Sequence, residues 1–411
     1  MIKPRLMPAL CWLMGVSWLV PVFAQTTREE ADVRTAVQRS LPFLEKEGVA
    51  WMTSKGCASC HQVPFLLWSH AEARASGIAV DDRKLAEWTE WTWQFSRTRR
   101  AWFKLTKESL DAPREHDVLP PEVSAKLKDL IEKPFATEEQ LVAELARVLT
   151  REELTQHKAA LVKRATRPLE PDNDGGGLDT LSQLLLGRAR DPDIAKASEY
   201  RADLRDLMLR WQQPDGSWKA AGQLPSQNRP PAESNEVSTR WAVLALGSPE
   251  KPDAPTDQAV KRALDFLCKT KPGSSNESLV TALLVEQKYG TAERAADLLA
   301  QLRARQNPDG GWAWRGTGDS DAFATGQSLY ALNQSSLRAD DPVVQRGVGH
   351  LIKSQQADGS WLVPSRAISA ATNQARLDKL APIYRYWGTA WASIGLSGTL
   401  PGSQPKHAWK P

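Results

Sequence analysis

The segment QQPDGSW at residues 212–218 recurs as QNPDGGW at 306–312 and as QQADGSW at 355–361. Each copy follows an amphipathic stretch with helical spacing and precedes a more apolar one. An Asp-Gly pair at this place ends a helix with a turn of positive φ, and the Trp can then pack back between neighbouring helices. Because the whole pattern returns with the same flanks, it indicates a helical-hairpin repeat.

Weaker copies of this hairpin extend along the chain. Six apolar stretches have the character of inner helices, and they begin near Cys60, Gly177, Glu236, Glu277, Asp321 and Arg385. More charged stretches precede them as outer helices, near residues 31–48, 138–163, 197–211, 257–269, 291–305 and 341–354. Since six hairpins can close a ring, the sequence predicts an all-α fold, an (α/α)6 toroid around a central cavity.

The Q-x-x-D-G-[SG]-W segments resemble the QW repeats of the squalene-hopene cyclase and prenyltransferase-like superfamily, over roughly residues 177–398. The segment CASCHQ at 57–62, together with SDAFATGQSLYAL at 320–332, is also similar to exported bacterial squalene-cyclase-like proteins. The resemblance implies an α/α toroid. It implies the fold more firmly than an activity, which has to be argued from the site itself.

Residues 1–24 have the pattern of a secretory signal. Lys3 and Arg5 precede an apolar run, and Val22-Phe23-Ala24 offers a small-x-small cleavage site. An uncleaved anchor stays open as an alternative, but Pro8 and Pro21 argue against a stable membrane-spanning helix. We therefore expect a periplasmic or secreted protein without a stable membrane span after cleavage.

The expected organisation has five parts: the signal peptide at 1–24, a first hairpin at 25–79, a Trp-rich helical insertion at 80–135, toroid repeats at 136–400 and a tail at 401–411. In the insertion, Trp88, Trp91, Phe95 and Trp102 fall at helical spacing on one face. This face is either a core-facing stripe or a lid over the edge of a haem, a group that a segment such as CASCH at 57–61 can bind.

Cys57, Cys60 and His61 form a CxxCH motif behind the signal. Two thiols one helical turn apart can bond to the two haem vinyl groups, and the adjacent imidazole can bind the iron. The motif predicts one covalent c-type haem with His61 as the proximal ligand. A Cys57–Cys60 disulfide in an oxidising compartment, or a metal site, remains an alternative.

The sixth iron ligand is harder to assign. His70 lies nine residues after His61, so on one helix it points to the opposite face about 13 Å away and cannot bind the same iron. The methionines after the signal are Met52 and Met208. His116 in the insertion is the candidate distal ligand, and a five-coordinate iron is equally compatible.

The segment GDSDAFAT at 318–325 is similar to the D-x-D-D-T-A motif of the hopene-forming cyclases, whose middle aspartate protonates an alkene. Asp319 and Asp321 match the first two aspartates, whereas Ala322 replaces the third. Protonating an alkene needs an unusually strong acid, so the missing carboxylate weakens this assignment. Asp321 can instead cap the inner helix that follows it.

The net charge of +4 is small, and basic and acidic residues are interleaved along the chain, so no nucleic-acid partner is indicated. Cys268, beside Phe266 and Leu267, reads as a buried thiol. We expect haem-linked electron transfer or ligand binding, with a redox partner protein or a small apolar ligand. The alternatives are a terpenoid cyclase-like isomerase that uses Asp319 and Asp321 on a polyisoprenoid, and a haem-free binding or scaffold ring with a Cys57–Cys60 disulfide. The sequence leaves open whether the protein is an enzyme.

Overall fold

The computed structural model describes residues 20–55, 62–98, 103, 105–111, 119–131, 133, 135, 138–165, 177–188, 194–220, 227–248, 252–335, 337, 339–366 and 374–401. Within these ranges the chain is helical, and β-structure is limited to isolated bridges such as the one between Phe103 and Phe135. Of the helices described, none has both the length and the apolarity needed to cross a membrane.

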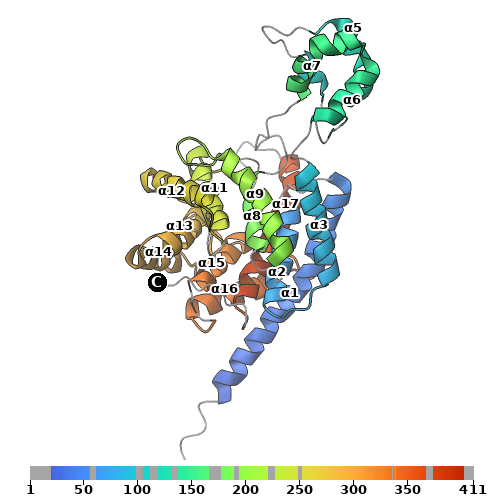
Figure 1. Cartoon of the computed structure of the whole chain (residues 1–411). Coiled ribbons are helices and arrows are strands. Elements are labelled where there is room, and N and C mark those ends of the chain that lie inside the picture. Colours follow the sequence, from blue (N-terminus) through green and yellow to red (C-terminus); the bar gives the residue numbers. More distant parts are fainter. Residues whose placement is uncertain are drawn as a thin grey trace, which may run out of the picture.

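Twelve of the described helices alternate between an outer and an inner ring (Figure 1). The outer helices are α1 (Val20–Lys55), α3 (Asp82–Thr98), α9 (Ile194–Trp211), α12 (Ala254–Lys269), α14 (Ala292–Ala304) and α16 (Pro342–Ser354). The inner helices are α2 (Gln62–Ala75), α8 (Leu178–Arg188), α11 (Pro231–Leu246), α13 (Asn276–Tyr289), α15 (Ala322–Gln334) and α17 (Gln374–Gly398).

The inner ring is closed. Each inner helix packs on the next in the order α2, α8, α11, α13, α15, α17, and α17 packs again on α2. The inner helices are buried nearly all round, whereas α12 and α16 bury only one stripe each. The predicted all-α toroid is therefore confirmed, and the six predicted inner helices are the ones observed.

The three repeated segments at 212–218, 306–312 and 355–361, which we call the DGxW segments, all adopt the same turn. Gly216, Gly310 and Gly359 have φ values of 91°, 89° and 84°, as the sequence predicts for this turn. A Cβ on Gly359 would lie 1.9 Å from the carbonyl oxygen of Arg39 in α1, so the turn presses directly against the next outer helix.

The Trp of each segment is fully buried and fixes the turn to the two helices that flank it. The indole Nε1 groups of Trp218, Trp312 and Trp361 each donate to a carbonyl ten residues earlier, at 2.7–2.8 Å. Their backbone N–H groups each donate to a threonine of the following inner helix at 3.0 Å; these are Thr239, Thr325 and Thr389.

The first Gln of each segment joins one outer helix to the next. Gln212 Nε2 donates to the carbonyl of Ala259 in α12, and Gln306 Nε2 to that of Val343 in α16, both at 2.8 Å. Gln355 Nε2 donates at 2.8 Å to the carbonyl of Ala36 in α1. This third bond closes the outer ring between distant parts of the chain.

A second hydrophobic core lies outside the ring. It is built from α4 (Lys107–Asp111), α5 (Pro121–Lys126), η2 (Lys128–Leu130), α6 (Glu138–Val148) and α7 (Arg151–Ala165). Leu127, Leu141, Leu145 and Leu161 are fully buried there. The segment 138–163 was expected to be an outer helix of the ring, and this assignment is wrong because its apolar face packs into the second core instead.

The outer position ahead of α8 is taken by α3. Leu85 and Trp88 of this helix belong to the core of the ring, and the Trp93 indole donates to Asp203 of α9 at 3.1 Å. The expected insertion at 80–135 thus begins with a helix that packs on the ring. Trp88 is buried as a core-facing residue, whereas Trp102 and the side chain of Phe95 lie outside the described residues.

Candidate functional site

The inner helices run in the same direction, so their first turns gather at one mouth of the ring. Neighbouring inner helices hydrogen-bond to one another: Ser238 of α11 donates to Asp179 of α8, Arg240 of α11 donates to the carbonyl of Ser278 in α13, and Asn276 of α13 donates to the carbonyl of Ala324 in α15. The described first turns of these helices therefore share this mouth, which we call the inner mouth. Its polar side chains form a connected buried cluster.

Glu277, in the first turn of α13, is the hub of the cluster. Its Oε2 accepts hydrogen bonds from Arg229 at 2.8 Å and from Gln227 at 3.2 Å, and its Oε1 accepts one from the Trp241 indole at 3.0 Å. The Arg229 and Glu277 side chains are 2% and 7% exposed. Removing either partner would break a buried ion pair, which is costly to stability.

Asp179, in the first turn of α8, is the most perturbed acid of the mouth. Burial, with the Glu277 carboxylate adding to it, raises the pKa of Asp179 to about 7. Ser238 Oγ donates to its two oxygens at 3.1 and 3.2 Å. A carboxyl that exchanges its proton near neutral pH can act as a general acid or base, but it is far too weak an acid to protonate an alkene.

Asp321 lies at the start of α15 and has two partners. Its Oδ1 accepts from the backbone N–H of Ala324 at 2.8 Å as an N-cap, and its Oδ2 pairs with Arg366 at 2.5 Å. The carboxylate is thus engaged both by the helix cap and by a buried ion pair. Asp319 is exposed on the loop before it, so the two matched aspartates do not form one buried pair.

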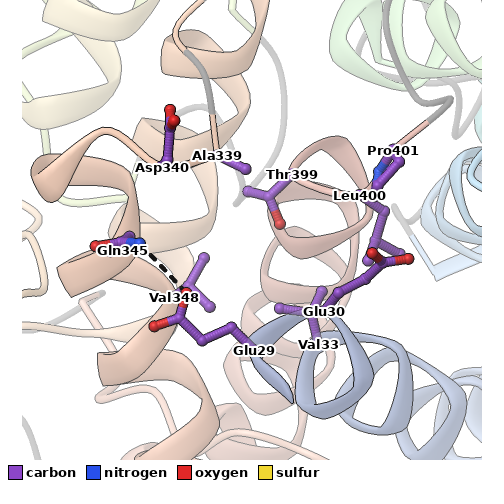
Figure 2. A pocket seen from close by; sticks show the side chains of 10 residues that line it. All are labelled: Glu29, Glu30, Val33, Ala339, Asp340, Gln345, Val348, Thr399, Leu400 and Pro401. Atoms are coloured by element: carbon purple, nitrogen blue, oxygen red, sulfur yellow. Dashed lines mark hydrogen bonds between the residues drawn. The ribbon is translucent and has the colours of Figure 1, made fainter. Parts of the chain in front are cut away.

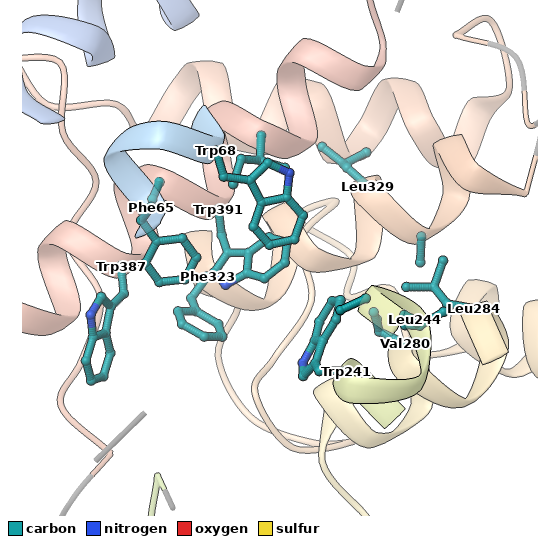
Figure 3. Close-up of a cluster of buried hydrophobic side chains, with 14 of the residues drawn as sticks. Phe65, Trp68, Trp241, Leu244, Val280, Leu284, Phe323, Leu329, Trp387 and Trp391 are labelled. Carbon is teal, nitrogen blue, oxygen red and sulfur yellow. The ribbon is translucent and has the colours of Figure 1, made fainter. Parts of the chain in front are cut away.

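Aromatic side chains from several inner helices pack together in the core of the ring (Figure 3). Trp391 of α17 is at the centre, with ring centroids 5.1 Å from Trp68, 5.7 Å from Trp241 and 6.2 Å from Phe323. The Trp241 indole also reaches Glu277, so the cluster and the polar mouth are continuous. These side chains are nearly fully buried and form an aromatic floor beneath the inner mouth.

Cys57, Cys60 and His61 fall in the connection between α1 and α2 and lie outside the described residues, as does His116. The residue that follows the motif is well fixed. The Tyr386 hydroxyl donates at 2.7 Å to the carbonyl of Gln62, and burial raises the pKa of Tyr386 well above its usual range, so it remains a donor. The motif therefore leads straight into a rigid, buried first turn at the inner mouth.

Other possible iron ligands are engaged elsewhere. His70 is buried, its Nδ1 is 2.8 Å from the carbonyl of Leu66, and burial lowers its pKa to about 4. Its ring also lies edge-on to Trp88, with 5.3 Å between the ring centroids. Met208 is fully buried in the ring core, and Met52 packs against that core from α1. Within the described chain, no group of three His, Cys, Asp or Glu side chains is placed to hold a metal ion.

A pocket of about 240 Å³ lies away from the inner mouth, between the start of α1, α16 and the end of α17 (Figure 2). Glu29, Glu30 and Asp340 line it above an apolar floor that includes Val33 and Leu400. Gln345 donates to Glu29 at 3.3 Å, and Arg34 pairs with Glu30 at 3.0 Å. Its carboxylates thus already have partners.

The sequence interpretation missed several residues of the mouth: Asp179, Gln227, Arg229 and Arg366. Asp179 could have been found, since it is an acid in the first turn of an otherwise apolar helix. Gln227 and Arg366 stand in loops, and no periodic pattern marks them. Cys268, expected to be buried, is exposed on α12, because an outer helix buries only one stripe.

Comparisons with known proteins add a local match. No family model matches the chain. A segment of 71 residues is 37% identical to squalene–hopene cyclase of Bradyrhizobium diazoefficiens, and it covers 17% of this chain and 11% of that enzyme. A short part of the chain is therefore similar to a squalene–hopene cyclase, and most of that enzyme's length has no counterpart in the match.

Solved structures show only distant likeness. The type II terpene cyclase MstE from Scytonema is 12% identical, with 90% of this chain and 99% of that chain covered and a TM-score of 0.30. The glycosyl hydrolase family 88 protein from Bacteroides vulgatus is 11% identical, with coverage of 89% and 99% and a TM-score of 0.35. The assignment of a toroid therefore rests on the closed inner ring of this chain itself.

Proposed function

We propose that this chain is an exported helical toroid that carries one c-type haem at its inner mouth and acts in one-electron transfer or in haem-linked binding of a small apolar ligand. The observation that carries the proposal is the CxxCH motif directly ahead of α2, whose first residue, Gln62, is fixed by Tyr386. The signal pattern at 1–24 supports export, where thioether haem is attached.

The residue types of the motif suit such a group. Cys57 and Cys60 would hold the haem covalently, and His61 would bind its iron, which supplies one-electron chemistry when bound. Gln62, Val63 and Phe65, which follow the motif directly, are buried in the first turn of α2. The aromatic floor beneath the mouth excludes water from the side that faces the ring.

The proposal is tested by expression with c-type maturation machinery. We expect a coloured protein that keeps its haem through acid-acetone extraction, because thioether bonds survive this treatment. The Cys57→Ala, Cys60→Ala double variant should lose the covalent haem, whereas Cys268→Ala, at an exposed thiol outside the motif, should keep it. A colourless wild type, or haem retained by the double variant, would overturn the proposal.

A second candidate function is terpenoid cyclase-like isomerisation of a polyisoprenoid, favoured by the local similarity to squalene–hopene cyclase. The pairing of Asp321 with Arg366 and the exposure of Asp319 oppose it. Incubation with squalene and mass spectrometry separate the two. Cyclised product that disappears in Asp321→Asn and persists in His61→Ala would favour the cyclase; its absence in wild type would remove this candidate.

A further inference from the structure

Arg366 is held as a ligand would be. It follows the third DGxW turn in a non-helical segment, residues 361–366, yet its side chain is only 5% exposed. Nη2 reaches Asp321 Oδ2 at 2.5 Å, and Nη1 donates to Gln227 Oε1 at 2.7 Å. Its guanidinium carbon stands 4.7 Å from the Phe323 ring centroid and 5.3 Å from that of Trp314.

The four groups around this guanidinium come from other parts of the ring and have their own supports. Asp321 is fixed by its cap bond to Ala324, and Gln227 donates separately to Glu277. Gln227 also has a φ of 34°, a conformation that non-glycine residues rarely adopt. Such a conformation persists only where the surrounding structure maintains it.

We propose that Asp321, Gln227, Phe323 and Trp314 form a guanidinium-binding cage that Arg366 occupies in cis, and that an external guanidinium compound can enter when Arg366 is displaced. A carboxylate and an aromatic face together attract organic cations. The two oxygen acceptors sit on different nitrogens of one planar group, which selects a guanidinium over a quaternary ammonium. Segment 361–366 then works as a strap that closes the cage.

The tethered arginine competes with any external ligand. A side chain held next to its site has a high effective concentration, so removing it should expose the full affinity of the cage. In Arg366→Ala we expect ethylguanidinium to bind at least about tenfold more tightly than in wild type, as measured by calorimetry. Tetramethylammonium should show no such gain.

Matched variants sharpen the test. Arg315→Ala removes an exposed arginine that stacks on Trp314 at 4.5 Å without entering the cage, and it should bind ethylguanidinium as weakly as wild type. The Arg366→Ala, Asp321→Asn double variant should lose the gain. Equal binding by Arg366→Ala and wild type, or full binding by the double variant, would overturn the proposal.

Wild type provides an independent measurement should Arg366→Ala lose its helical circular dichroism. Ethylguanidinium, kept well below denaturing concentrations, should speed amide hydrogen exchange in residues 361–366 relative to an equal concentration of sodium chloride. Unchanged exchange in this segment would count against the cage. None of these measurements uses haem, so the outcome is independent of the proposed redox function.

Discussion

Asp179 shows how one buried acid sets a pH dependence for the whole ring. Its pKa is raised from 3.8 to about 7, so the folded protein holds this proton more tightly than the unfolded chain does. Between pH 4 and 7 the folded state binds more protons, and stability falls as pH rises. Above pH 7 the destabilisation is complete, at most on the order of 4 kcal/mol.

Asp179→Asn should remove this penalty, because an amide stays neutral. We expect the variant to be nearly as stable as wild type at pH 4 and progressively more stable than wild type up to pH 8, as followed by thermal unfolding. His70 contributes the opposite slope between pH 6.5 and 4, but it does so in both proteins and cancels in the difference. Exposed Asp206→Asn is the control and should show no such trend. A stability difference that does not change with pH would contradict the assignment.

Some contacts at the inner mouth could be predicted from the sequence, and others could not. The N-cap alternative for Asp321 is confirmed by its bond to Ala324, because capping is local and depends on a few adjacent residues. Its ion pair with Arg366 joins positions 45 residues apart through a loop. No local sequence pattern predicts such a contact, so this part of the site could be identified only from the folded structure.

At the scale of the element, the DGxW turn requires glycine for two separate reasons. Gly359 has a positive φ, and any Cβ there would collide with the carbonyl of Arg39. Gly349 in α16, by contrast, is helical and has open space at its Cβ position.

We therefore expect opposite effects of the same substitution. Gly359→Ala should destabilise the protein by more than about 1 kcal/mol, because it adds strain and separates α1 from the turn. Gly349→Ala should stabilise it by about 0.5–1 kcal/mol, since alanine loses less entropy in a helix. Chemical denaturation measures both. Equal effects of the two changes on the free energy of unfolding would mean that the contact between this turn and α1 does not contribute to stability.

The inner helices could be predicted because they are apolar nearly all round, and three of them follow the recurring turn. The outer helices could not all be assigned in the same way. Residues 138–163 and α3 both carry an apolar stripe. Such a stripe predicts that one face of the helix is buried, but it does not identify the helices that this face packs against. Leu141 and Leu145 face the second core, whereas Leu85 and Trp88 face the ring.

At the scale of the whole molecule, the ring and the second core share no buried residue among those described. We expect two unfolding transitions in calorimetry. Leu145→Ala should shift only the transition of the second core, and Leu329→Ala only that of the ring, each costing roughly 2–5 kcal/mol because both side chains are fully buried. A single transition moved by both variants would show that the two cores unfold together.

The bond from Gln355 to Ala36 spans 319 positions of the chain. If the chain is exported as proposed and its N-terminal end leaves the translocation channel first, α1 and α2 emerge long before the helices that later pack against them. Until α16 and α17 follow, the apolar flank of this first hairpin has no covering partner, which is a state prone to aggregation. Contacts of such long range also slow the final step of folding. If the chain is exported as proposed, we expect a holding chaperone to protect this intermediate until the ring has closed.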